Sequence, residues 1–354
     1  MLGRSWCEIN LEQLKTNYLI CKDKIQGEIT AVVKADAYGH GAVAVSKALQ
    51  SVGCNSFAVA TLEEGIQHRH GGIKGPISIL GYTPVTMLKC LKNNDLCQVV
   101  FSKEYADALI EENEYLNVQM AIDTGMNRIG FRWENQDEII QTYEKLTKTC
   151  WVKGVFTHLA CADDKNADNF TDLQIHRFLE VVNKLDGLVN CHFSNSAYFL
   201  NNKEGDKSNA RLGICLYGLG ENLLEGMKPV LKWKSVVVMV KRLQAGEGVG
   251  YGQTFVAKKD MVVATVATGY ADGFSYSLSN LGKVEIRNQF ARVIGRVCMD
   301  MLMIDVSHID TVSVGDEVIL LGEKYGANEM SVDLKTIPYE IVCNISKRVF
   351  RVYK

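Results

Sequence analysis

The stretch Ala31-Val-Val-Lys-Ala-Asp-Ala-Tyr-Gly-His-Gly41 guides our interpretation of the whole chain. It begins as an apolar strand, reaches Lys34 where the strand ends, and turns through glycine into a helix from about residue 42. In α/β proteins the chemistry is concentrated at the carboxyl ends of such strands. An isolated lysine at a strand end is more often a solvated surface residue. Partial burial, however, lowers the pKa of an amine and makes it available as a nucleophile or Schiff-base partner, which we expect for Lys34.

Strand-like and helix-like segments alternate outward from this stretch. A strand at 6–10 and a helix at 11–25 come first, and apolar strands are then expected at 28–33, 56–60, 77–80, 98–101, 118–122, 152–157 and 189–193, with 212–217 as a candidate to close the set. Helices are expected between them at 42–51, 62–70, 84–93, 103–112, 135–148, 172–185 and 196–200. About eight βα units with short connections predict an α/β fold with a (β/α)₈ barrel. A doubly wound sheet is the alternative, but no G-x-G-x-x-G opens a helix here.

The pattern changes near residue 231. Short strands rich in valine and isoleucine follow at 232–243, 261–267, 283–286, 289–297, 301–305 and 317–321, and helical spacing returns only at 331–337. This pattern is typical of a smaller, mostly β domain. We therefore predict a barrel domain over residues 1–230 and a mostly β domain over 231–354, with the strand in residues 1–10 as a candidate to join the β domain.

Composition excludes several classes of partner. The 354 residues are 47% apolar and 23% charged with a net charge of −2, which is ordinary for a soluble globular protein and gives no electrostatic reason to expect nucleic acid. No apolar run reaches the roughly 18 residues of a membrane span, and we expect no signal peptide. The eleven cysteines form no C-x-x-C pair, so we expect reduced thiols, no metal site and a cytoplasmic location.

Eight further motifs accompany the Lys34 stretch. They are A-I-D-T-G-M-N-R-I-G at 121–130, F-T-H-L-A at 156–160, H-F-S-N-S-A at 192–197, R-L-G-I-C-L-Y-G at 211–218, V-G-Y-G-Q-T at 249–254, the pair G-Y-A-D-G at 269–273 and G-R-V-C-M-D at 295–300, and P-Y-E-I-V-C at 338–343. Together they resemble the motifs of the alanine racemase family over almost the whole chain. The resemblance implies a barrel followed by a β domain, a pyridoxal 5'-phosphate cofactor, and a head-to-tail homodimer that supplies D-amino acids for peptidoglycan.

The resemblance also implies roles for the cofactor-binding residues. Lys34 would hold the cofactor covalently, His158 would lie beside it, and Arg211 would face the pyridine nitrogen. Contacts to the phosphate would come from Tyr38, Ser196, Gly213, Ile214 and Tyr339, with His192 and Asn195 in supporting roles. Because an arginine keeps its proton, the pyridine nitrogen stays unprotonated. The pyridine ring is then a weaker electron sink, which suits racemisation better than transamination. Leu212 replaces the usual proline of this motif.

Racemisation removes a proton from one face of Cα and returns one to the other, which two opposed bases do directly. By resemblance these bases are Lys34 and Tyr251 of the other subunit. Tyrosine is a poor base at its ordinary pKa of about 10, so His158 and Arg211 are candidates to assist it. The substrate would be bound by Arg128, Met299, Asp300 and Tyr270.

One position departs from the family pattern. Many members carry a lysine seven residues before the arginine that Arg128 matches, and the carbamate of that lysine holds the arginine in place. This chain has Ala121 there, so Arg128 must be positioned by other means.

Read without the family, His158 is more often a core histidine, Met299 a core residue and G-Y-A-D-G a β-turn.

The resemblance fixes the reaction better than the substrate. Because of the absent lysine and the polar Asn344, the chain also resembles the catalytic domains of membrane-bound serine/alanine racemases of vancomycin-resistance clusters. This resemblance would make the chain the cytoplasmic part of an anchored protein. An alanine-only racemase is the alternative. Less favoured are a pyridoxal-phosphate carrier without catalysis, a decarboxylase of similar architecture, and a binding barrel without cofactor, which would leave Lys34, Arg128 and Arg211 with no anion to meet.

Overall fold

The computed structural model describes residues 3–112, 114–188, 190–202 and 208–354. Its contacts divide the chain into two compact units. The barrel unit consists of Leu14–Ala37 and Ala42–Met227. The β unit consists of Met1–Gln13, Tyr38–Gly41 and Lys228–Lys354. No helix in the described part of the chain combines the length and the apolar character needed to cross a membrane.

Eight parallel strands close into a ring in the described part of the barrel unit. The ring closes because β5 pairs with β6 and β10 pairs with β2. The strands are β2 (Ile29–Val32), β3 (Ser56–Val59), β4 (Ile77–Ile79), β5 (Cys97–Val100), β6 (Asn117–Asp123), β8 (Trp151–Phe156), β9 (Cys191–Asn195) and β10 (Asn209–Leu212), and the short β7 (Phe131–Arg132) extends β6. The predicted (β/α)₈ barrel is therefore confirmed.

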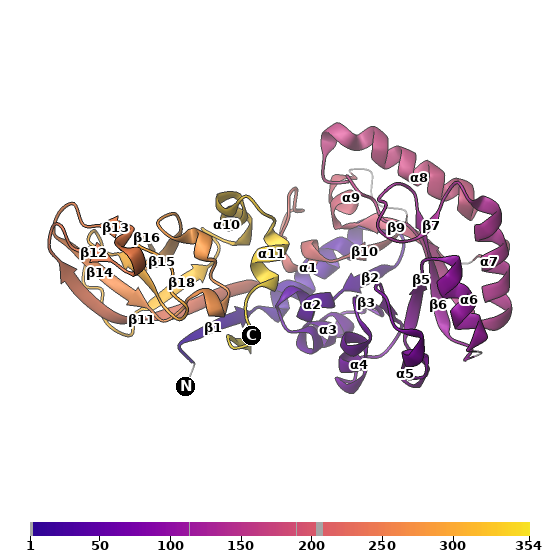
Figure 1. The fold of residues 1–354 in the computed structure, drawn as a ribbon, viewed down its shortest axis with the longest axis horizontal. Helices are drawn as coiled ribbons and strands as arrows, with labels where there is room; N and C mark the ends of the chain where they lie inside the picture. Colours follow the sequence, from indigo (N-terminus) through magenta and orange to yellow (C-terminus); the bar gives the residue numbers. More distant parts are fainter. Residues whose placement is uncertain (1–2, 113, 189, 203–207) are drawn as a thin grey trace. The chain divides into compact units, whose positions relative to one another are not determined.

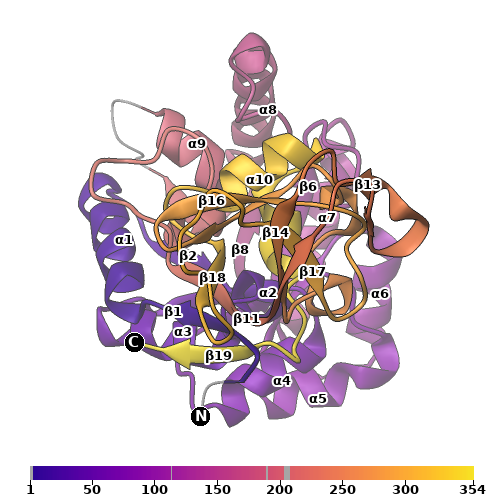
Figure 2. The same cartoon turned by 90° about the vertical axis from the view of Figure 1, so that its left-hand side faces the viewer.

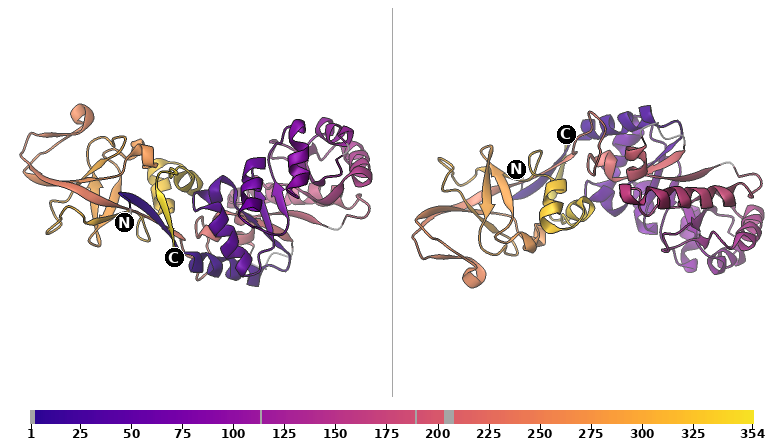
Figure 3. Two further views of the ribbon diagram at one scale, coloured as in Figure 1. Left: turned by 90° about the horizontal axis from the view of Figure 1, so that it is seen from below. Right: turned by 90° about the horizontal axis from the view of Figure 1, so that it is seen from above.

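Helices cover the outside of this ring (Figures 1 and 3). They are α1 (Leu11–Lys24), α3 (Ala42–Ser51), α4 (Leu62–His70), α5 (Leu88–Asn93), α6 (Lys103–Glu111), α7 (Gln136–Thr149), α8 (Asp168–Val182) and α9 (Ser196–Asn201). Most of them bury apolar residues at helical spacing, as α7 does with Ile139, Tyr143 and Leu146. Packing of these stripes against the strands fixes the strand ends, where the candidate site residues lie.

The predicted last strand at 212–217 was wrong. The strand is β10 (Asn209–Leu212), and Ile214–Tyr217 forms a 3₁₀ helix, η3. Gly213, with φ −124° and ψ −96°, breaks the extended run, and Leu216 N–H donates to its carbonyl at 2.9 Å. All four residues of η3 are buried, and an apolar run buried on every side carries no period that distinguishes strand from helix. Of the predicted strand 189–193, residue 189 lies outside the described residues.

The β unit is built on a closed ring of antiparallel strands. Its order is β11 (Leu231–Leu243), β14 (Met261–Val266), β17 (Leu302–Asp305), β16 (Gln289–Val293), β15 (Lys283–Ile286) and β18 (Glu317–Leu321), which pairs back to β11. Beyond β11, the N-terminal β1 (Ser5–Ile9) pairs antiparallel with it, and the C-terminal β19 (Phe350–Tyr353) pairs parallel with β1 (Figure 2). The predicted mostly β C-terminal domain is confirmed.

Several smaller elements of the β unit differ from the prediction. The helical segment expected at 331–337 is two helices, α10 (Ala327–Leu334) and α11 (Pro338–Cys343). Lys335, with φ +53°, ends the first, and Pro338 opens the second, where its missing N–H is not needed. The strand expected at 289–297 ends at Val293, and a small hairpin of β12 (Gly248–Val249) and β13 (Phe255–Val256) was not predicted.

Candidate functional site

Lys34 lies at the carboxyl end of β2 and opens α2 (Lys34–Tyr38), a left-handed turn. Ala35, Asp36, Ala37 and Tyr38 all have φ between 51° and 54°. Non-glycine residues pay about 1–2 kcal/mol each for this conformation. Glu64 of α4 offsets part of that cost, because its two carboxylate oxygens accept from Ala35 N–H and Ala60 N–H, each at 2.7 Å. Strain of this kind clusters at functional sites.

Arg211 lies in β10 and is only 5% exposed. Its guanidinium donates to Nδ1 of His192 and to the carbonyl of Thr157 at 2.7 Å, and it stacks 4.9 Å from the ring of Phe156. All of these partners are neutral, and no carboxylate in the described part of the chain pairs with it. Burial, and then the charge of Arg128, lower the pKa of Arg211 to about 9, so it remains protonated at neutral pH.

His192 in β9 connects Arg211 to the inside of the barrel. Burial and the neighbouring Arg211 lower its pKa well below the ordinary value, so the ring is neutral. Since Nδ1 accepts from Arg211, the proton is on Nε2, which donates to Oε1 of Gln119 at 3.2 Å. Gln119 in turn donates to Oγ of Ser78 at 3.3 Å. This chain of hydrogen bonds fixes the guanidinium of Arg211 on the side that faces His192.

His158 follows β8 at the same end of the barrel. Its Nδ1 is 3.4 Å from a guanidinium nitrogen of Arg211. Burial and the positive charges of Arg211, Arg128 and Lys34 lower its pKa to about 3. Three cationic side chains thus disfavour the charged form of His158, and Arg211 is the one that the structure places beside it.

This arrangement fits an anionic ligand with an acceptor atom. The buried Arg211 pairs with no carboxylate among the described residues, and an anionic or acceptor group beside it would lower the cost of burying its charge. A phosphate ester with a pyridine nitrogen matches these donors, because Arg211 can donate to the nitrogen and Lys34 offers an amine for covalent attachment. In the described part of the chain no group of three histidine, cysteine or carboxylate side chains could hold a metal ion.

The segments expected to hold the phosphate lie beside β9 and β10. Ser196 begins α9, and Asn195 caps this helix by accepting from Tyr198 N–H at 3.0 Å. Asn195 also donates to the carbonyl of Leu159 at 3.3 Å, which ties α9 to the loop after β8. Gly213 N–H donates to Oγ of Ser196 at 2.9 Å, so Gly213, Ile214 and Ser196 form one corner.

Tyr38 and Tyr339 lie together in the β unit. Their rings are 5.8 Å apart at 61°, an edge-to-face pair, and Tyr38 is buried whereas Tyr339 is 37% exposed. Arg351 holds the neighbouring turn, since its Nε donates to the carbonyl of Gly39 at 3.0 Å. A Cβ at Gly39 would lie 2.2 Å from the carbonyl of Val342, so only glycine permits this approach.

Tyr251 opens a short 3₁₀ turn, η4 (Tyr251–Gln253), and its side chain is 72% exposed. It lines an open pocket of about 530 Å³ with Val249, Thr265, Cys298 and Met303. Tyr270 and Met299 are half exposed on two segments that hydrogen-bond each other through Tyr270 N–H to the carbonyl of Cys298 at 3.0 Å. Tyr251, Tyr270 and Met299 thus present exposed side chains on the β unit.

The carboxylate of Asp300 is engaged in an ion-pair network. Its carboxylate pairs with Arg348, which also donates to the buried Asp272 at 2.7 Å. Arg4 donates to the same Asp272 at 2.8 Å.

Asn344 is exposed at the end of α11 and lines a small cavity of about 130 Å³ that includes Ser275, Ser277 and Trp233.

Sequence reasoning missed two glutamines that organise the barrel site. Gln119 supports His192, and Gln174 of α8 hydrogen-bonds the loops after β6 and β8. The available signal was a polar residue on an apolar stripe, because Thr171, Gln174, Phe178 and Val181 form one buried face. A glutamine is common on helices, so this signal is weak without the structure.

Comparisons with known proteins agree along the whole chain. The family description "Alanine racemase, N-terminal domain" matches residues 9–221, and "Alanine racemase, C-terminal domain" matches residues 230–353. Among curated relatives, the alanine racemase of Clostridium tetani is 40% identical and that of Clostridium perfringens 41%, over 98% and 99% of this chain and 95% of each relative.

Solved structures give the same result. The alanine racemase of Clostridium difficile 630 superimposes with a TM-score of 0.93 at 36% identity, covering 100% of this chain and 96% of that one. The alanine racemase of Bartonella henselae, solved with covalently bound pyridoxal phosphate, superimposes with a TM-score of 0.91 at 27% identity, covering 99% of this chain and 100% of that one. The chain therefore belongs to the alanine racemase family, whose members depend on pyridoxal phosphate.

Proposed function

We propose that this protein is a pyridoxal-phosphate-dependent racemase that interconverts L- and D-alanine. The observation that carries the proposal is that Lys34, Arg128, His158 and Arg211 all lie at the carboxyl ends of barrel strands, with Arg211 3.4 Å from His158. The relatives described above are all named alanine racemases, which supports the choice of substrate.

The proposed cofactor contacts divide between its ring and its phosphate. Lys34 attaches it covalently, and Arg211 donates to the pyridine nitrogen while keeping its own proton. Ser196, Gly213, Ile214, Tyr38 and Tyr339 hold the phosphate. When bound, the cofactor withdraws electrons from the substrate and makes the Cα hydrogen acidic. An unprotonated ring nitrogen withdraws them less strongly, which favours racemisation over side reactions.

Two bases move the proton in this proposal. The amine of Lys34 serves one face of Cα, and the phenol of Tyr251 from a second copy serves the other. The strong exposure of Tyr251 on the β unit supports its reaching a partner rather than its own core. We accordingly propose a head-to-tail homodimer, in which each β unit completes the site of the other copy.

The substrate carboxylate is proposed to meet Arg128 and the backbone N–H of Met299, with Tyr270 at the entrance. A guanidinium binds a carboxylate through two parallel hydrogen bonds, which fixes its orientation. The Asp300 carboxylate is engaged by Arg348. Its proposed role is therefore to hold the Met299 loop rather than to touch the substrate.

Serine is the second substrate to test. A hydroxymethyl group is discriminated by about 1–3 kcal/mol unless a paired polar group reads it. Asn344 was the candidate for such a group, and it is exposed at the end of α11 beside Ser275 and Ser277. The names of the relatives favour alanine, so serine turnover and a role in vancomycin resistance are not part of the main proposal.

The deciding experiment is a racemisation assay on the purified protein with L-alanine and L-serine in parallel, together with its visible spectrum. A yellow protein that converts L-alanine to D-alanine supports the proposal. Comparable rates on serine would extend it to a serine/alanine racemase and make Asn344→Ala worth testing. A yellow protein that converts neither would support the carrier alternative and overturn the proposal.

A further inference from the structure

Arg128 is held by its backbone rather than by its side chain. It lies in the loop between β6 and β7, its side chain is exposed, and in the residues the structure describes nothing hydrogen-bonds or ion-pairs with it. Ala121 packs with Val99 and Phe156 in an apolar cluster, so it cannot reach the guanidinium. The position of Arg128 therefore depends on what fixes residues 124–130.

The start of this loop is shaped locally. One carboxylate oxygen of Asp123 accepts from Gly125 N–H and Asn127 N–H, each at 3.0 Å, which is an Asx-type turn. Gly125 has φ +140°, and Asn127 has φ +55°. These bonds set the curvature of the loop but leave it without an anchor to the rest of the barrel.

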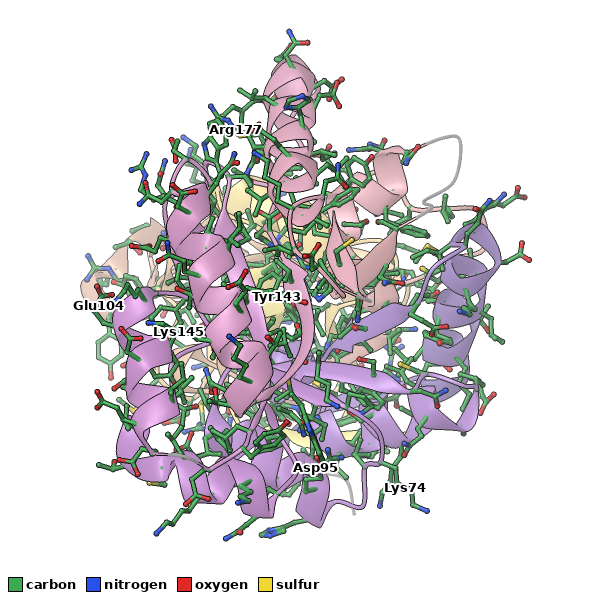
Figure 4. The ribbon with its side chains drawn as sticks, turned by 90° about the vertical axis from the view of Figure 1, so that its right-hand side faces the viewer. Lys74, Asp95, Glu104, Tyr143, Lys145 and Arg177 are labelled. Atoms are coloured by element: carbon green, nitrogen blue, oxygen red, sulfur yellow. The ribbon has the colours of Figure 1, made fainter. Side chains whose placement is uncertain are left out.

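Helix α8 supplies that anchor through one face. Phe170, Gln174 and Arg177 are spaced by four and three residues, so they project from the same side of the helix. A Cβ at Gly125 would lie 2.8 Å from the ring of Phe170, so the two are in close contact. Arg177, which is seen on α8 in Figure 4, donates to the carbonyl of Thr124 at 2.9 Å and lies 4.8 Å from the ring of Trp133.

Gln174 makes the central contacts of this face, and it is fully buried. Its Oε1 accepts from Ala160 N–H at 2.9 Å, and its Nε2 donates to the carbonyl of His158 and to Oγ1 of Thr124, each at 3.1 Å. The orientation of the amide is unambiguous, because a backbone N–H only donates and a carbonyl only accepts. Thr124 Oγ1 is also 2.8 Å from Oγ1 of Thr157, to which it can donate its own proton.

We propose that Gln174 is a positioning residue that couples the loop carrying Arg128 to the loop carrying His158. The hydrogen bonds of Gln174 make this a structural coupling. Its consequence for substrate binding rests on the function proposed above. Because Arg128 has no side-chain anchor among the described residues, loosening Thr124 shifts its guanidinium relative to Arg211 and Lys34.

Hydrogen–deuterium exchange on the full-length protein tests the coupling without using activity. Gln174→Met keeps the side-chain length and removes all three hydrogen bonds. We expect backbone exchange in 124–130 and 158–162 to accelerate about tenfold or more, with β2 to β5 unchanged. Unchanged exchange in both loops, or an equal acceleration throughout the barrel, would overturn the proposal.

Thr171→Val is the matched control. It lies one turn earlier on the buried face of α8, and in the described part of the chain its hydroxyl has no hydrogen-bond partner. Replacing it leaves shape and burial nearly unchanged, so exchange in both loops should match the wild type. An acceleration as large as that of Gln174→Met would mean that any change on this face loosens the loops, and would sink the assignment to Gln174.

Gln174→Asn guards against poor folding of the methionine variant. It keeps a neutral amide but is one methylene shorter, so it cannot bond to both loops at once, and both loops should still exchange faster. In the racemase assay, KM for alanine should rise about fivefold to twentyfold in both variants, more than kcat falls, since Arg128 meets the substrate. A wild type without racemase activity would contradict the proposed function, while the exchange result would still decide the coupling.

Discussion

The guanidinium of Arg211 donates to Nδ1 of His192, and both side chains are buried in the barrel. The charge of Arg211 is one of the causes that keep the histidine neutral, and the neutral histidine in turn offers the arginine an acceptor. Neither residue meets a carboxylate through a bond among the described residues. This pair explains how a cation is held at the mouth of the barrel by neutral acceptors.

Replacing His192 by phenylalanine should destabilise the barrel. Phenylalanine keeps the stacking on Phe156, where the rings are 5.2 Å apart at 4°, but it removes the acceptor. A buried guanidinium N–H without a partner costs about 1–3 kcal/mol. Urea denaturation should show this loss in the free energy of unfolding. His70→Phe, on the exposed end of α4, is the control, and equal losses in both variants would contradict the role assigned to His192.

The two site histidines predict a loss of stability in acid. The unfolded chain takes up protons at His158 below a pH of about 6.5, whereas the folded protein resists until about pH 3. Protons therefore bind the unfolded state preferentially, and stability falls as the pH drops through this window, by at most about 1.4 kcal/mol per pH unit for each such histidine.

A variant that cannot titrate isolates this effect. In His158→Asn the free energy of unfolding, measured by urea denaturation between pH 7.5 and 5, should depend less steeply on pH than in the wild type. The exposed His70→Asn serves as the control and should keep the wild-type slope. Equal slopes for His158→Asn and the wild type would mean that His158 is not held neutral in the folded protein.

Lys34→Ala should yield a colourless protein. Without the amine the cofactor has no point of covalent attachment, so the visible band of the purified protein should be lost, and added pyridoxal phosphate should be removed by dialysis. Lys74→Ala, in an exposed turn before β4 (Figure 4), should retain the band. A persistent visible band in Lys34→Ala would move the attachment to another lysine.

The sequence predicted the barrel because its strands are short, apolar and separated by helices with a clear period. It mispredicted Ile214–Tyr217 because a run buried on every side has no period to read. The left-handed turn from Ala35 to Tyr38 was not foreseen, since none of these residues favours that conformation and Glu64, nearly thirty residues later, stabilises it. Gln174 was missed for a similar reason, because its partners come from two loops that only the fold brings together.

Tyr251→Phe tests the proposal of two opposed bases, provided that the right quantity is measured. L- and D-alanine have equal free energies, so kcat/KM for the two directions must fall together in every variant, and racemisation rates alone cannot separate the two bases. Exchange of the Cα hydrogen with solvent deuterium can. With only Lys34 left, one enantiomer should keep exchanging while exchange of the other and racemisation drop by about 10²–10⁴-fold.

Tyr276→Phe, which keeps an exposed ring near Tyr270, should leave both exchanges unchanged. Equal loss of exchange for both enantiomers in Tyr251→Phe would instead indicate that the phenol helps to bind or orient the substrate, and that the second proton comes from another group.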